Sequence, residues 1–149
     1  MSTRSVVHTH HAPAAVGPYS QAIRTESLIF TAGQIALDPA TGKLVAGDVS
    51  DQARQVMKNL EAVLAAAGSD LSHVLKTTIF LVDMADFAEV NAVYGSHFAA
   101  APPARSTVAV VALPLGALVE IEVVALPRER ASATLTSAVS QHTVAVGEG

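Results

Sequence analysis

The chain has 149 residues, a formal net charge of −4 and a composition that is 50% hydrophobic and 15% charged. These values predict one globular domain with a sizeable core. An acidic pI near 5.8 and 4% aromatic residues with no Trp argue against a nucleic-acid partner. The absence of Cys excludes disulfides, thiolate metal ligands and thiol nucleophiles. No apolar run reaches ~18 residues and no secretion signal is recognisable, so we expect a cytoplasmic protein without a membrane partner.

The N-terminal third has the composition of short extended segments separated by turns. Residues 5–7 predict a first strand, and a Gly-Pro turn places Tyr19 at the start of the next extended segment. A buried strand is predicted over residues 28–35. Gly33 within it is typical either of a β-bulge or of close approach by a ligand or another backbone. The histidines at positions 8, 10 and 11 lack an acidic residue or cysteine at ligand spacing, so we predict no metal site.

Two stretches have the periodicity of amphipathic helices. In the first, Ser50 is the predicted N-cap and Gly68 the stop signal. The second begins near Asp86, and its inward-facing stripe consists of Phe87, Val90, Asn91, Tyr94 and Phe98. Asn91 is the polar member of that stripe, and an inward amide without a hydrogen-bond partner costs about 1–3 kcal/mol. We expect Asn91 to support a loop or cap, or to line a site.

Three strands are predicted in the second half of the chain, over residues 73–82, 105–113 and 118–126. The short connection between the last two predicts that they pair as antiparallel neighbours. In the last strand, Glu120 and Glu122 project from one face because side chains alternate along a strand. That face is either a solvated side of the sheet or the location of a proton carrier whose pKa a pocket tunes.

Arg105 introduces a guanidinium at the start of a strand that is otherwise uncharged and strongly apolar. Pro102 and Pro103 precede it and exclude a helix, so the side chain leaves from a stiff strand start. A guanidinium in this position suits bidentate binding of a carboxylate. It equally suits an internal salt bridge to a strand carboxylate such as Glu120. The residues alone leave both interpretations open.

The predicted order of elements, β-β-β-α-β-α-β-β, gives an α+β domain in which two helices cover one face of a mixed sheet. Residues 107–113 are apolar on both faces of their strand, so both faces are expected to be buried. The second face then needs another subunit, and we expect a closed symmetric oligomer. Composition changes after Pro127. We therefore assign residues 1–127 to the domain and residues 128–149 to a C-terminal tail of unassigned role.

Six segments, in this order and spacing, resemble the RidA/YjgF family of enamine/imine deaminases. They are APAAVGPYSQA at 12–22, TAGQI at 31–35, VLKTTIFL at 74–81, FAEVNAVY at 87–94, PARST at 103–107 and VEIE at 119–122. The resemblance covers about Val6 to Leu126. It implies a chorismate-mutase-like fold that assembles as a homotrimer with active sites between subunits.

By position, the resemblance gives Arg105 the role of binding the substrate carboxylate and Glu120 that of positioning or activating water. The other pocket positions that it implies are occupied by Tyr19, Ala32, Gly33, Asn91 and Thr107. Thr107 replaces a cysteine that is usual in the archetypal deaminases, and Ala32 replaces a serine found in many members. We expect activity to survive these departures and specificity to drift.

The implied reaction is hydrolysis of 2-aminoacrylate, through 2-iminopropionate, to ammonia and pyruvate. Arg105 aligns the carboxylate, and a water on Glu120 attacks an imine carbon that is electrophilic without a metal or an organic cofactor. Two alternatives remain open. One is another enamine, such as an aminomuconate-type intermediate, and the other is a non-catalytic regulatory trimer that binds a small ligand. Catalysis is favoured because a site that only binds a carboxylate needs no nearby acid.

Overall fold

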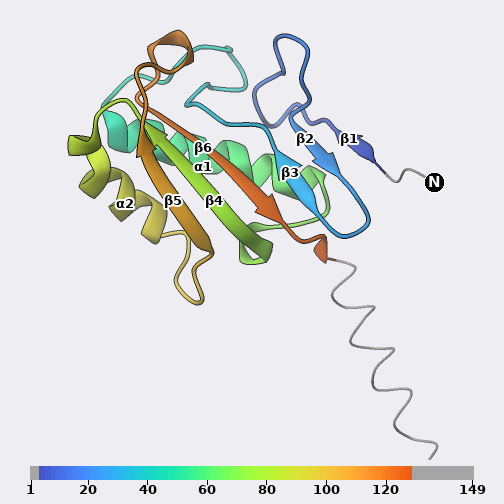
Figure 1. The fold of residues 1–149 in the computed structure, drawn as a ribbon. Helices are drawn as coiled ribbons and strands as arrows, with labels where there is room; N and C mark the ends of the chain where they lie inside the picture. Colours follow the sequence, from blue (N-terminus) through green and yellow to red (C-terminus); the bar gives the residue numbers. More distant parts are fainter. Residues whose placement is uncertain (1–3, 129–149) are drawn as a thin grey trace, which may run out of the picture.

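A computed structural model describes residues 4–128, which form a single six-stranded mixed sheet with two helices (Figure 1). The strands are β1 (Ser5–Val7), β2 (Ala22–Arg24), β3 (Ile29–Thr31), β4 (Val74–Leu81), β5 (Ala104–Ala109) and β6 (Val119–Ala125). The helices are α1 (Val49–Ala66) and α2 (Phe87–Gly95). The predicted order of strands and helices is confirmed. The predicted tail, apart from Arg128, lies outside the described residues.

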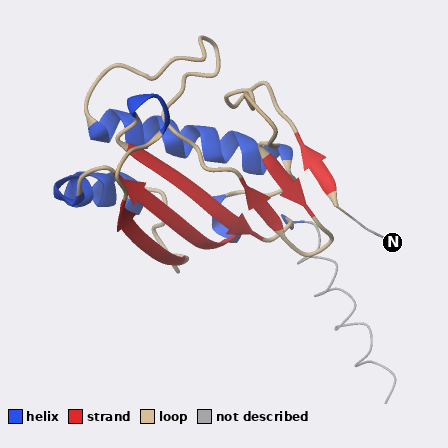
Figure 2. Cartoon of the chain, turned by 45° about the horizontal axis from the view of Figure 1, so that its top comes forward, coloured by secondary structure: helices blue, strands red, loops and turns tan. Residues whose placement is uncertain are grey.

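Both helices pack on the same face of the sheet (Figure 2), and the hydrophobic core lies between the two layers. In β6, Val119, Ile121 and Val123 are buried while the residues between them are half-buried. This period of two points one set of β6 side chains at the helices. The core residues of α1 are Val56, Met57, Leu60, Val63 and Leu64. The prediction of an α+β sheet with two helices on one face is therefore confirmed.

The strand order is β1-β2-β3-β6-β4-β5, so β5 lies at one edge and does not pair with β6. β5 runs parallel to β4, and β4 pairs with β6 in the antiparallel sense. The prediction that the last two strands are antiparallel neighbours is wrong. The crossover through α2 returns the chain parallel to β4. Residues 110–118 then carry it past the end of β4 to β6 on the other side.

No element among the described residues covers the face of the sheet opposite the helices (Figure 2). Phe30 of β3 and Val108 of β5 project from this face and are 46% and 42% exposed. Val111, just after β5, is fully exposed. A single chain thus leaves apolar surface in water at a place where the sequence predicts burial. Within the described residues, no helix is long and apolar enough to cross a membrane.

The N-terminus of α1 is held by a capping box that Asp48 and Asp51 form. Each carboxylate accepts a hydrogen bond of 3.0 Å from the backbone N–H of the other residue. Ser50, the predicted N-cap, lies inside the first turn and donates to Glu89 of α2 at 3.3 Å. The prediction was two residues late because Asp48, Ser50 and Asp51 are all residue types that favour a cap.

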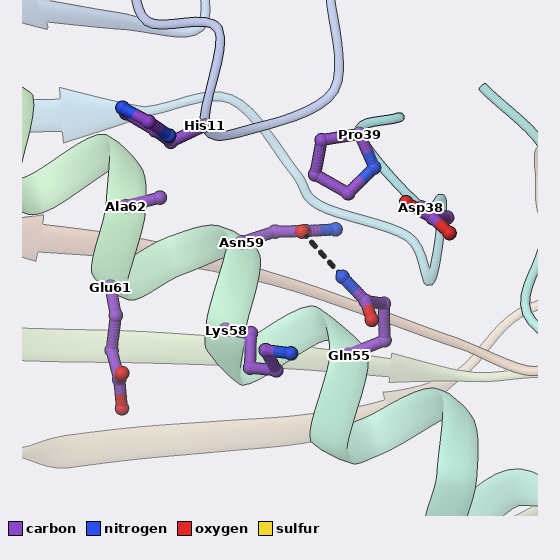
Figure 3. Close-up of a pocket in the computed structure, with 8 residues that line it drawn as sticks. All are labelled: His11, Asp38, Pro39, Gln55, Lys58, Asn59, Glu61 and Ala62. Carbon is purple, nitrogen blue, oxygen red and sulfur yellow. Dashed lines mark hydrogen bonds between the residues drawn. The ribbon is translucent and has the colours of Figure 1, made fainter. Parts of the chain in front are cut away.

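Asn59 connects α1 to the loop that follows β3. Its buried Nδ2 donates to the backbone oxygens of Ile35 at 3.2 Å and Leu37 at 2.9 Å. Its Oδ1 accepts from Gln55, the bond drawn in Figure 3 beside a polar surface pocket. This loop contains Gly33, so Asn59 fixes the backbone that follows this predicted site residue.

Asn59→Ala is expected to lower the free energy of unfolding by about 1–3 kcal/mol, because two hydrogen bonds to loop carbonyls are lost. Gln55→Ala is the matched control, since it removes only the half-buried bond between the two side chains. Urea unfolding monitored by circular dichroism measures both effects. Equal losses in the two variants would contradict the role given to the Asn59 amide.

Candidate active site

The guanidinium of Arg105 lies on the helix side of β5, where α2 holds it. Its Nη1 donates to Asn91 Oδ1 at 2.7 Å. Its Cζ lies 5.0 Å from the ring centroid of Tyr94 and 5.5 Å from that of Phe87. Among residues 4–128, no carboxylate forms an ion pair with it. Within the described residues, Arg105 therefore forms no internal salt bridge to Glu120 or to another strand carboxylate.

Asn91 lies on the exposed surface of α2 and does not face the core. Its amide oxygen accepts the hydrogen bond from Arg105, so support of a loop or cap, one of the two predicted roles, is wrong. The difference arises because α2 lies along the edge strand β5. Part of its apolar stripe therefore faces the sheet edge instead of the interior.

Glu120 lies on the opposite face of the sheet from Arg105. It alternates with Val119 and Ile121, which are buried against the helices. Arg105 is in register with Thr77, whose hydroxyl bonds the Tyr94 hydroxyl of α2 at 2.8 Å. The sheet itself thus separates the two predicted catalytic side chains, and one chain does not bring them together around a single small substrate.

Gly33 makes room for the Glu120 carboxyl group. Gly33 follows β3, and its neighbour Gln34 pairs with Ile121 of β6 through two backbone hydrogen bonds of 2.9 and 3.1 Å. A Cβ placed on Gly33 would lie 2.8 Å from the Cδ and Oε1 of Glu120. The predicted strand over 28–35 is shorter than expected and ends before the glycine. The glycine is therefore explained by the close approach of another group, which is the Glu120 side chain of the same chain.

Burial raises the pKa of Glu120, and the neighbouring carboxylate of Glu122 raises the same pKa further. Both effects disfavour the charged form, the first through lost hydration and the second through repulsion. A carboxylate with a raised pKa is a stronger base than an ordinary glutamate. This shift suits Glu120 for taking a proton from water and returning it later in a reaction.

Gly33→Ala is expected to displace the Glu120 side chain and to lower turnover about tenfold or more, because a methyl group would occupy the space of the carboxyl. Gly95→Ala is the control, since a Cβ at that position meets nothing within 4 Å. Steady-state kinetics measure the effect, with thermal unfolding as a check on the fold. Unchanged kcat in Gly33→Ala would show that the contact does not position Glu120.

Tyr19 and Ala32 line a shallow surface pocket near Gly33, together with Arg4, Gly17, Pro18, Ser20, Ile23, Phe30 and Thr31. The loop before Tyr19 is fixed by Gln21, whose buried side chain accepts from Thr9 N at 2.7 Å and donates to Pro13 O at 2.8 Å. The backbone oxygen of Gln21 also accepts from Ala32 N at 2.9 Å. Sequence reasoning missed Gln21. The signal in the sequence was a glutamine placed between the predicted Gly-Pro turn and the apolar residues Ala22 and Ile23.

Thr107 lies two residues after Arg105 in β5 and therefore on the same face. Its Oγ1 is buried and has no hydrogen-bond partner among the described residues. The predicted site residues thus fall into two groups. Asn91, Arg105 and Thr107 gather where α2 meets β5, whereas Tyr19, Ala32, Gly33 and Glu120 gather around β3 and β6.

A family model described as Endoribonuclease L-PSP matches residues 9–127, which span the whole sheet and both groups of site residues. The chain belongs to the RidA/YjgF family. One relative from this family is Reactive Intermediate Deaminase A of Arabidopsis thaliana, which is 53% identical over 82% of this chain and 65% of the plant protein. Another is the 2-iminobutanoate/2-iminopropanoate deaminase of Mus musculus, which is 49% identical over 83% of this chain and 91% of its own length.

Solved structures of the RidA/YjgF family have the same fold. The crystal structure of E. coli TdcF with bound serine superposes with a TM-score of 0.77, at 41% sequence identity, over 82% of this chain and 98% of that chain. The mixed sheet with two helices is therefore the fold of the family. Named relatives within the family are deaminases of imines.

Proposed function

We propose that this member of the RidA/YjgF family is a hydrolytic deaminase of small enamines and imines that carry a carboxylate, such as 2-aminoacrylate and 2-iminopropionate. The observation that carries the proposal is the set of contacts that Arg105 makes. Its guanidinium contacts only neutral side chains, and no described carboxylate pairs with its charge. Such a guanidinium is a receptor for a substrate carboxylate. The name of the mouse relative and the serine bound to E. coli TdcF agree with a small carboxylate ligand.

In the proposed reaction, 2-iminopropionate and water give pyruvate and ammonia. Glu120 accepts a proton from water while the oxygen forms a bond to C2, and the electron pair of the C=N bond moves to nitrogen. Glu120 then returns the proton to nitrogen, which gives a carbinolamine with a hydroxyl and an NH2 group on C2. Glu120 next transfers the hydroxyl proton to nitrogen, the C–N bond breaks, and ammonia leaves as the C=O bond of pyruvate forms. Arg105 holds the carboxylate throughout and aligns C2 with the water.

We further propose that each active site combines residues of two chains within a homotrimer of chorismate-mutase-like fold. The supporting observation is that Arg105 and Glu120 lie on opposite faces of the sheet in one chain. The exposed apolar side chains of the uncovered sheet face, Phe30 and Val108, favour the same assembly because their burial stabilises an interface. Glu120 of one subunit then meets Arg105 of its neighbour.

The test uses a pyridoxal-phosphate-dependent dehydratase that releases 2-aminoacrylate from serine, and follows the loss of 2-iminopropionate with and without the protein. We expect the protein to accelerate this loss in proportion to its concentration. No acceleration would overturn the proposal. In that case an aminomuconate-type enamine as substrate, or a pocket that only binds a carboxylate ligand, is the interpretation to pursue.

A further inference from the structure

Three uncharged residues of α2, spaced at i, i+4 and i+7, surround the guanidinium of Arg105. Phe87 and Tyr94 contribute ring faces, and Asn91 contributes an amide oxygen. This spacing places all three on one side of the helix. We call this group the neutral cradle. All three belong to the stripe that the sequence predicts to face inward, toward the core.

We propose that Phe87 and Tyr94 are positioning residues that fix the Arg105 guanidinium for the substrate carboxylate without neutralising its charge, with Asn91 as the neutral acceptor. The proposal rests on the proposed function, since it assigns a purpose to Arg105 as the carboxylate receptor. Ring centroids at 5.0 and 5.5 Å from Cζ are within the range of cation–π attraction.

The Tyr94 ring is itself fixed before any ligand arrives. Its hydroxyl makes a 2.8 Å hydrogen bond with Thr77 of β4, and both residues are buried. On its other side it packs against Phe98, with ring centroids 4.7 Å apart. One ring of the neutral cradle is therefore held by contacts of its own, which reduces the side-chain entropy lost when a ligand binds.

The carboxylate that α2 carries is directed away from Arg105 and does not compete with a ligand. Glu89 is the one carboxylate within α2, and its Oε2 accepts from Ser50 of α1, which directs it away from β5. A carboxylate in the cradle would pair with Arg105 and occupy the donors that a substrate needs. An aromatic face attracts the cation through its quadrupole and carries no net charge. The full charge of Arg105 therefore remains available.

Asn91→Asp gives the sharpest contrast, because it keeps the size of the side chain and places a negative charge 2.7 Å from Nη1. Asn91 is exposed, so the fold tolerates the change. We expect the dissociation constant for pyruvate and the KM for 2-iminopropionate to rise about tenfold or more, with a smaller change in kcat. Phe87→Leu is expected to raise both constants about fivefold, and Phe87→Tyr to restore them because it keeps the ring.

The experiment measures pyruvate binding by titration and imine hydrolysis by the coupled assay, for wild type, Asn91→Asp, Phe87→Leu and Phe87→Tyr. Weaker binding in the first two variants and wild-type binding in the third supports the neutral cradle. Wild-type pyruvate binding in Asn91→Asp and Phe87→Leu overturns it while the deaminase proposal stands. If wild type neither binds pyruvate nor hydrolyses the imine, the proposed function fails and the cradle proposal with it.

Discussion

Arg105→Ala is expected to lower kcat/KM for 2-iminopropionate by about a hundredfold or more, because the substrate carboxylate loses its charged hydrogen-bond donors. The same variant should lose its affinity for pyruvate, which carries the same carboxylate. Stability should change little, since Arg105 is exposed and, within residues 4–128, its side chain hydrogen-bonds only to Asn91. Coupled hydrolysis, pyruvate titration and thermal unfolding measure the three effects.

Arg54→Ala is the matched control, since Arg54 is an exposed arginine of α1 that pairs with Asp51 of the same helix. It removes the same charge from the protein and should leave turnover unchanged. Retained turnover in Arg105→Ala would show that Arg105 does not bind the substrate. If the proposed trimer forms in wild type and dissociates in Arg105→Ala, the guanidinium has a structural role instead.

Glu120→Gln is expected to lower kcat by about 10²- to 10⁴-fold, because the amide has the size of the carboxylate and cannot accept a proton from water. Pyruvate affinity should stay close to that of wild type, since the amide leaves Arg105 of the proposed neighbouring subunit in place. Steady-state kinetics and pyruvate titration separate the two quantities. An unchanged kcat would exclude Glu120 as the base.

Glu122→Gln is the control on the same strand and the same face. The charge of Glu122 contributes to the raised pKa of Glu120, so its removal lowers that pKa. The reaction requires ionised Glu120, and kcat falls as the pH falls through its pKa. We therefore expect Glu122→Gln to keep most of its activity and to move the acid limb of the pH profile to lower pH. An acid limb that stays in place would show that another group controls it.

Local patterns in the sequence predicted the secondary structure well, and pairing between distant strands less well. The periodicity of α1 and the β-branched run of β4 are visible in the sequence. The position of β5 is not, because the short connection through residues 114–116 favours a hairpin when considered alone. The crossover through α2 decides the outcome by placing β5 parallel to β4.

For the candidate site, too, the sequence indicates which residues matter better than it indicates how they are placed relative to one another. The motifs point to Arg105 and Glu120, and the proline-stiffened strand start draws attention to the guanidinium. Their separation by the sheet depends on register, which sets the face of every strand residue. The contact between Gly33 and the Glu120 carboxyl, and the rings that hold Arg105, depend on tertiary packing and have no signal within a single segment.

Co-expression of Arg105→Ala with Glu120→Gln tests the central claim most directly, namely that imine hydrolysis needs Arg105 of one chain and Glu120 of another. Each variant alone is expected to be inactive. When the two variants are present in equal amounts and assemble at random, each site has one chance in two of an intact Arg105 and one chance in two of an intact Glu120. About a quarter of wild-type activity should therefore return. Mixed oligomers that form and stay inactive would contradict a site built from two chains.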